Sequence, residues 1–206
     1  MTTTEAAPAP QLDAQGRKLL FTEARTANSF SDTKVADAQL DAIWELAKWA
    51  PSSMNSQPLR VTWIRSSEGK ERVARHLMEP NRAKTLSAPV VALLAYEPNF
   101  AEHFTTTFPE RAEMYSGFFA SLPPEHVDAA ARYNAAVQTG VFILAIRAQG
   151  LAAGPMTGFD PVGMDAEFFA QTGWRSHAVV NIGHPGANAW FDRLPRVPDA
   201  TAVSWA

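Results

Sequence analysis

The chain has 206 residues and a formal net charge of −3, and it contains no Cys. Its length suits one domain, and its 46% hydrophobic content is enough to form a core, so disorder is excluded for most of the chain. The slight acidic excess argues against a nucleic-acid-binding protein, and the lack of Cys excludes disulfides, thiolate catalysis and Cys-type zinc or iron–sulfur sites.

We expect residues 1–12 to form a loose tail ahead of a single domain over residues 13–206. The tail is polar and rich in Pro and Ala, without the basic start and apolar stretch of a secretory signal. The most apolar segment, 141–146, is far too short to span a bilayer. We therefore expect a cytoplasmic protein with neither a membrane nor a nucleic acid as partner.

The first half of the domain has the pattern helix, loop, strand, helix. Apolar residues between 35 and 50 repeat at helical spacing, and a proline stops the pattern. The Pro-, Ser- and Asn-rich stretch 51–58 has the composition of an exposed loop. LRVTWI at 59–64 predicts a strand, and Ser66 or Ser67 is placed to cap the helix that follows.

The second half predicts two more strands and a long helix. The continuous apolar run 88–96 is typical of a strand covered on both faces, and 177–183 predicts another strand. Residues 127–149 give the strongest helical pattern, apolar nearly all round, so we expect the sheet on one side and another subunit on the other. The Phe-rich stretch 99–126 predicts short helices. Together these elements indicate an α+β or mixed α/β arrangement in which helices flank a sheet.

Searches for common catalytic motifs are negative. The sequence has no GxGxxG and no Walker-type GxxxxGK, so neither a dinucleotide-binding Rossmann turn nor a P-loop is supported. Its five His residues form no HExxH, and no GxSxG occurs, which argues against zinc and serine hydrolases. We expect no metal site.

Five polar clusters remain, each at the edge of a predicted element. Their order and spacing resemble the FMN-dependent nitroreductase superfamily over about residues 20–206, and most of all its malonic semialdehyde reductase (3-hydroxypropanoate dehydrogenase)-like branch. The clusters are RTANSF at 25–30, APSSMNSQP at 50–58, NRAK at 81–84, GPMTGF at 154–159 and RLPR at 193–196.

The resemblance implies a nitroreductase-like α+β fold. Its central sheet would be mixed but mainly antiparallel and flanked by helices, with a dimer-forming buried helix and an extended C-terminal tail. It also implies a homodimer with FMN at the subunit interface and NADH or NADPH as hydride donor.

The resemblance assigns the FMN phosphate to the first and last clusters. Arg25 would pair with the phosphate, and Thr26 and Asn28 would donate hydrogen bonds to phosphate or ribityl oxygens. Asn28 stands where many members carry a second basic residue, so Arg193 becomes more important for neutralising the phosphate.

The loop 50–58 is similar to one that reaches the flavin from the other subunit. Its small polar residues would allow close approach to the edge of the ring, where bulky side chains would not fit. The residues implied are Pro51, Ser52, Ser53 and Asn55. The alternative is a helix-terminating turn whose Asn55 and Gln57 only satisfy loop backbone.

The remaining two clusters would surround the flavin ring. Asn81 and Lys84 are three residues apart and so share one helix face, and the Lys84 ammonium would stabilise the negative charge of reduced flavin. Residues 155–157 (Pro155, Met156 and Thr157) would line the ring, and the Gly158 N–H would contact its N5 atom. Thr157 stands where many relatives carry an acidic residue. No side chain is identified as a certain catalytic residue.

The implied reaction is a ping-pong transfer of hydride from NAD(P)H through FMN N5 to a small carbonyl substrate such as malonic semialdehyde, giving 3-hydroxypropanoate. Arg111 would hold the substrate carboxylate, and Tyr115 and Phe118 would wall the pocket. The alternatives are a nitroaromatic or quinone reductase of broad specificity, a non-catalytic flavin-binding protein, and a structural domain without cofactor.

Overall fold

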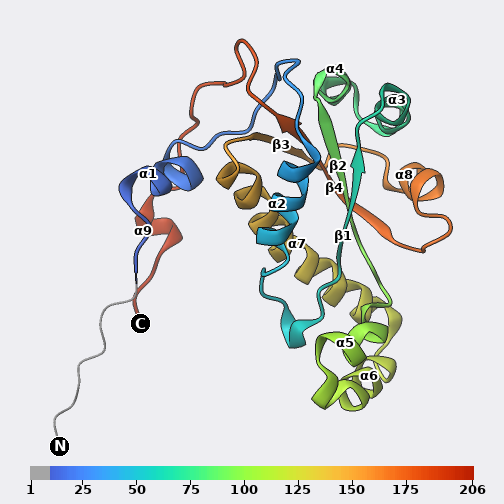
Figure 1. Cartoon of the computed structure of the whole chain (residues 1–206). Helices are drawn as coiled ribbons and strands as arrows, with labels where there is room; N and C mark the ends of the chain where they lie inside the picture. Colours follow the sequence, from blue (N-terminus) through green and yellow to red (C-terminus); the bar gives the residue numbers. More distant parts are fainter. Residues whose placement is uncertain (1–9) are drawn as a thin grey trace, which may run out of the picture.

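A four-stranded antiparallel sheet lies between two groups of helices in the computed structural model, which describes residues 10–206 (Figure 1). The strand order is β1-β2-β4-β3, and every pairing in this sheet is antiparallel. The predicted α+β class and the mainly antiparallel sheet are confirmed, and the sheet contains no parallel pair. The strands are β1 Leu59–Ile64, β2 Val90–Tyr96, β3 Ala152–Met156 and β4 Arg175–Gly183.

Strand β2 is apolar throughout because both of its faces are buried. Side chains of a strand point alternately to opposite faces, and here the two sets enter two separate hydrophobic cores. Val90, Ala92, Leu94 and Tyr96 face one core, and Val91, Leu93 and Ala95 face the other.

Helices cover both faces of the sheet (Figure 1). The long helix α7 packs with α2 on one face, and α3, α4 and α8 lie on the other. The helices are α1 Ala14–Arg17, α2 Asp37–Ala47, α3 Ser67–His76, α4 Glu79–Ser87, α5 Phe104–Thr107, α6 Ala112–Ala120, α7 Pro124–Ala148, α8 Pro161–Phe168 and α9 Asp199–Ala202.

Most element predictions agree with the structure to within a few residues. The Ser66 hydroxyl accepts a hydrogen bond from the Gly69 N–H and so caps α3. Helix α7 begins at Pro124, before the predicted start, and it is followed by Gly150 at φ +71°. Strand β3 was not predicted, since its sequence AAGPM is short and contains a proline, which a strand tolerates only at a sheet edge.

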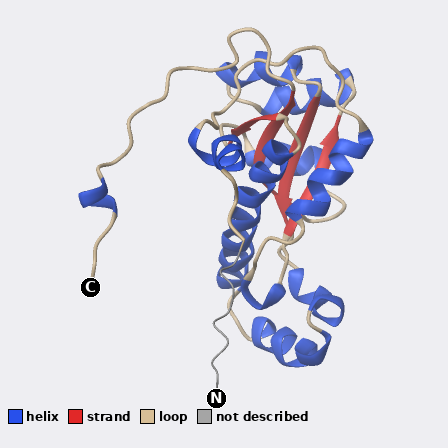
Figure 2. Cartoon of the chain, turned by 60° about the vertical axis from the view of Figure 1, so that its left-hand side comes forward, coloured by secondary structure: helices blue, strands red, loops and turns tan. Residues whose placement is uncertain are grey.

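The C-terminal part of the chain extends from this body (Figure 2). Figure 2 shows the segment after β4 leaving the sheet and ending well away from it. This confirms the predicted C-terminal tail, which is interrupted only by the short helix α9 and exposes Leu194 (75%) and Trp205 (97%). Of the predicted N-terminal tail, residues 10–12 are exposed and without regular structure, and residues 1–9 lie outside the described residues.

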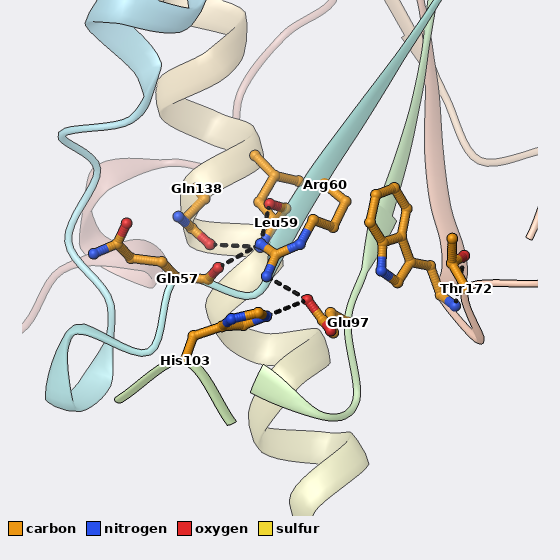
Figure 3. A network of polar contacts seen from close by, with 8 residues as sticks. Gln57, Leu59, Arg60, Glu97, His103, Gln138 and Thr172 are labelled. Carbon is orange, nitrogen blue, oxygen red and sulfur yellow. Dashed lines mark hydrogen bonds and ion pairs between the residues drawn. The ribbon is translucent and has the colours of Figure 1, made fainter. Parts of the chain in front are cut away.

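A polar network ties the Phe-rich excursion 99–126 to the sheet. Figure 3 shows Arg60 of β1, Glu97 at the end of β2 and His103 pointing toward one another. The Arg60 guanidinium pairs with the Glu97 carboxylate and also donates to the Gln57 carbonyl, while His103 Nε2 lies 2.9 Å from the same carboxylate. The start and the later part of the excursion pack together through an aromatic cluster of Phe100, Phe104 and Phe119.

None of the helices within residues 10–206 is both long and apolar enough to cross a bilayer.

Helices α3 and α8 are joined by the Glu167 carboxylate. It accepts a hydrogen bond from Arg72 Nε at 2.7 Å and lies 2.6 Å from His76 Nε2. These two hydrogen bonds lower the pKa of Glu167 below its usual value. The ionised carboxylate is therefore a stabilising group in the folded protein.

We expect Glu167→Gln to lower the free energy of unfolding by about 1 kcal/mol at neutral pH. The pKa of Glu167 is lower in the folded than in the unfolded chain, so its stabilisation is complete above about pH 4.3 and is lost as pH falls through the folded-state pKa. Urea unfolding of both proteins across pH 3–7 measures this. The control is Glu71→Gln, an exposed position on α3, and an equal loss of stability in both variants would contradict the assignment.

Candidate functional site

Four of the five predicted clusters meet along strand β3. The segment 25–30 lies directly against this strand, because the Ala27 N–H donates to the Ala153 carbonyl at 2.9 Å. The contact needs a glycine at the next position of the strand, since a Cβ on Gly154 would lie only 2.7 Å from the Ala27 carbonyl oxygen. On its other side, the Asn28 N–H donates to the Ala189 carbonyl at 2.9 Å. Segment 25–30 therefore lies between β3 and the start of the C-terminal tail.

Arginines of the first and last clusters lie close together at this point. Arg25 Nη1 donates to the Phe191 carbonyl at 3.1 Å, and its guanidinium lies 5.8 Å from the centre of the Trp190 ring. Arg193 Nη2 donates to the carbonyls of Thr22 and Ala24 at 2.7 and 3.2 Å. Each cluster thus holds the other in place through backbone carbonyls.

These arginines open onto a cavity of about 520 Å³, a volume in the range of small-molecule sites. All four residues predicted to hold a phosphate line it, namely Arg25, Thr26, Asn28 and Arg193. Its walls carry four arginines and a single carboxylate, Asp192. Within residues 10–206, none of these arginines forms an ion pair with an Asp or Glu. The cavity is therefore suited to an anionic ligand.

The third and fourth clusters meet just beyond the end of β3. The Asn81 side-chain amide and the Met78 N–H both donate to the Gly158 carbonyl, at 3.1 and 3.0 Å. A Cβ on Gly158 would lie 2.8 Å from Asn81 Nδ2, so a side chain there would displace the Asn81 amide. Lys84 precedes the buried Thr85 on α4 and is itself partly exposed. It forms no ion pair among the described residues.

The segment predicted to line a ring is accessible. Pro155 and Met156 are partly exposed, and Thr157 is exposed. The Thr85 hydroxyl donates a hydrogen bond to the Met156 sulfur atom at 3.9 Å.

The loop 50–58 lies elsewhere in the same chain. The Ser53 N–H donates to the Asn134 side chain on α7 at 2.7 Å, and the Asn55 side chain donates to the carbonyl of Thr107, the last residue of α5, at 2.6 Å. Its predicted contact residues Pro51, Ser53 and Asn55 are exposed, and Ser52 is partly exposed. One chain by itself does not bring this loop to the arginine-lined cavity.

The backbone of this loop is strained. Met54, Asn55 and Gln57 have φ of 54°, 54° and 45°, in the left-handed region that side chains other than glycine rarely adopt. The hydrogen bond from Gln57 Nε2 to Asn55 Oδ1 and that from the Gln57 N–H to the Ser52 hydroxyl hold this conformation. Strain that is retained in this way often marks a functional segment. The hydrogen bond from Asn55 to the Thr107 carbonyl is the kind of backbone contact that the alternative, a plain helix-terminating turn, predicts.

The predicted substrate residues lie beside this loop. Tyr115 packs against Phe104 and Phe108, with ring centres 5.6 and 5.2 Å apart, in the helices that follow Thr107. Arg111 and Phe118 are exposed. If these residues act at the arginine-lined cavity, a second copy of the chain has to supply them together with the loop.

Sequence reasoning missed three residues near the cavity: Lys18, Arg147 and Trp190. With Arg25 and Arg193 they line a second cavity of about 580 Å³. Burial lowers the pKa of Arg147 below its usual value. The sequence did indicate that Arg147 is unusual, because it directly follows the apolar run 141–146. Lys18 and Trp190 carried no signal, because nothing in their local sequence sets them apart.

Comparison with known proteins gives one consistent result. The sequence pattern of the Nitroreductase family matches residues 22–184. A provisionally named NADH dehydrogenase/NAD(P)H nitroreductase of Streptomyces coelicolor is 52% identical, over 97% of this chain and 98% of its own length. A similarly named protein of Streptomyces griseus is 46% identical, over 90% of this chain and 93% of its own length.

Solved structures share the fold at low sequence identity. A nitroreductase from Bacillus subtilis superimposes with a TM-score of 0.85 at 19% identity, covering 94% of this chain and 99% of that one. A nitroreductase from Exiguobacterium sibiricum, solved in complex with FMN, gives a TM-score of 0.84 at 17% identity, covering 95% and 99% of the two chains.

Proposed function

This chain belongs to the nitroreductase family, and we propose that it is a homodimeric FMN-dependent NAD(P)H oxidoreductase. The observation that carries the proposal is the group of arginines around the 520 Å³ cavity, in a chain whose overall charge is negative. Unpaired guanidinium groups in a cavity favour a multiply charged ligand such as a phosphate.

The described residues fit FMN. Arg25 and Arg193 supply charge-assisted hydrogen bonds for the phosphate, and Thr26 and Asn28 line the same cavity. Farther along β3 and just beyond it, the accessible segment 155–158 offers the side chains of Pro155 to Thr157 and the backbone of Gly158 to a flat ring. The two regions are joined by the close contact between Ala27 and Gly154.

FMN bound here would supply the redox chemistry, which is hydride transfer between a nicotinamide nucleotide and a second substrate. The protein's part is electrostatic and positional. Lys84 stands on the helix that contacts Gly158, and its positive charge favours the anionic reduced flavin. Asn81 holds the 156–158 segment against that helix through its bond to the Gly158 carbonyl.

A second copy of the chain would complete the site. The strained loop 51–55 is exposed and rigidly held, and it lies apart from the cavity of its own chain. Nearby apolar residues are also exposed, including Trp49 (79%) and, on the outer face of α7, Tyr133 (68%). Exposed apolar surface of this kind favours a protein–protein interface. We therefore assign α7 and the loop to the dimer contact, with the C-terminal tail extending over the partner.

The substrate we propose is a small carbonyl compound such as malonic semialdehyde, with Arg111 binding its carboxylate and Tyr115 and Phe118 walling the pocket. A nitroaromatic or quinone reductase of broad specificity is the alternative. The names of the relatives, NAD(P)H nitroreductases, favour it. A flavin-binding protein without catalytic activity would bind FMN and leave NAD(P)H unoxidised.

The purified protein should show flavin absorption bands that NADPH bleaches without oxygen. Arg25→Gln should weaken FMN binding at least roughly tenfold, because it removes a charged hydrogen-bond donor to the phosphate. Fluorescence titration with FMN measures the affinity. Arg75→Gln, an exposed arginine in α3 outside the site, should bind FMN like the unmodified protein. A colourless protein that takes up no FMN would refute the proposal.

The contribution of the second copy can be tested by co-expressing two variants, each of which is defective in a different part of the FMN site. Arg25→Glu disables the phosphate region, and Ser53→Trp places a bulky ring on the exposed loop. Neither variant alone should bind FMN well. Co-expressed, they should recover about a quarter of the sites, since half of the dimers are mixed and each has one intact site. If no sites are recovered although mixed dimers form, the loop serves its own chain.

Arg111→Ala should raise KM for malonic semialdehyde roughly tenfold or more, because it removes the positive charge that pairs with the carboxylate. Turnover of an uncharged nitrofuran should not change, which makes it the internal control. Steady-state assays at matched NADPH give both values. Unchanged kinetics with the aldehyde would remove Arg111 from the site, and a protein that reduces only the nitrofuran would favour the broad-specificity alternative.

A further inference from the structure

The second cavity, of about 580 Å³, adjoins the one assigned to the FMN phosphate. Arg25, Arg147 and Arg193 line both. Its separate walls come from the π-helical segment Lys18–Thr22 that follows α1, from the stretch 150–153 that leads into β3, and from Trp190. Within the described chain it therefore has residues that the FMN-phosphate cavity does not use.

This cavity is strongly positive. Four cations and one carboxylate, Glu23, line it. Glu23 lies 3.4 Å from Lys18 Nζ, but both side chains are more than 60% exposed, so water screens their attraction. Arg147, in the last turn of α7, makes one hydrogen bond, to the Leu20 carbonyl at 3.3 Å, and no ion pair within residues 10–206.

The positive charge exceeds what one phosphate needs. A phosphate monoester carries about −1.5 to −2 at neutral pH, which Arg25 and Arg193 together can balance. Arg147 and Lys18 then remain for another anion. A partly buried guanidinium without a carboxylate is costly in an empty cavity and favourable beside an anion.

An aromatic surface accompanies these charges. Trp190 lines the cavity and is 38% exposed. Aromatic side chains of this kind provide a surface on which a nucleic-acid base can stack. Positive charge next to an accessible indole suits a ligand that combines a flat base with phosphate groups.

We propose that the cavity formed by Lys18, Arg147, Trp190 and the 150–153 stretch binds the base and phosphates of an adenine nucleotide, separately from FMN. The inference rests on the proposed function, because NAD(P)H contains an adenosine diphosphate unit of this chemistry. A free adenine nucleotide has the same groups and is the other source.

The test is calorimetric titration of the FMN-loaded protein with ADP, which cannot reduce flavin. ADP should bind, and more weakly as salt is raised. Lys18→Glu should lower its affinity at least roughly tenfold while flavin content stays unchanged. Lys18 is exposed, so its variant should fold. Arg147→Gln should also lower the ADP affinity, and because Arg147 lines both cavities, the FMN affinity of this variant is measured alongside. Lys34→Glu, an exposed lysine away from the cavity, is the matched control.

Two arms distinguish the sources of the nucleotide. If ADP competes with NADPH and Lys18→Glu raises KM for NADPH with kcat unchanged, the site holds the coenzyme's adenosine end. If ADP binds alongside NADPH, the site takes a free nucleotide.

The inference is overturned if titration of the flavin-loaded protein with ADP releases or absorbs no heat of binding. It is also overturned if the unmodified protein and the Lys18→Glu variant bind ADP with equal affinity. Failure of the proposed function would be seen separately, as a protein that takes up no FMN, and the same ADP titration still measures the second cavity in that protein.

Discussion

The close backbone contact between Ala27 and strand β3 is the constraint on which the site depends. One hydrogen bond, from the Ala27 N–H to the Ala153 carbonyl, places segment 25–30 along the sheet edge. The missing side chain of Gly154 makes the approach possible. Arg25 of the first cluster then meets the C-terminal tail on one side, while the same strand leads on to Gly158 and α4 on the other.

Charge distribution gives this arrangement its chemistry. The chain is acidic overall, yet Arg25, Arg147 and Arg193 gather where two cavities adjoin. Other arginines are paired with carboxylates, as Arg60 is with Glu97 and Arg72 with Glu167. These two pairs join elements of the fold, whereas Arg25, Arg147 and Arg193 donate to backbone carbonyls, which leaves their net charge available to a ligand.

The dimer proposed here explains why the strained loop and the exposed face of α7 occur in the same chain. The loop is anchored on α7 through Asn134, so a partner that packs against this helix would meet the loop as well. Such a partner would also meet the short helices α5 and α6, because Thr107 accepts a hydrogen bond from Asn55 of the loop and Tyr115 packs just beyond it. Interface, loop and predicted substrate residues would then form one continuous surface.

Local patterns in the sequence determined most of the elements and the identity of four polar clusters that converge. The apolar run of β2, the helical period of α7 and the Ser66 cap are each set by residues close together in the chain. The likeness of the five clusters to one family rested on their types and order, which one sequence displays directly. Which clusters meet within one chain was decided only by tertiary structure, since the 25–30 segment, β3 and the tail are joined by contacts across more than a hundred residues. Edge strand β3 and the cavity roles of Lys18, Arg147 and Trp190 also depend on such contacts, because a proline-containing strand and an isolated cation carry no periodic signal of their own.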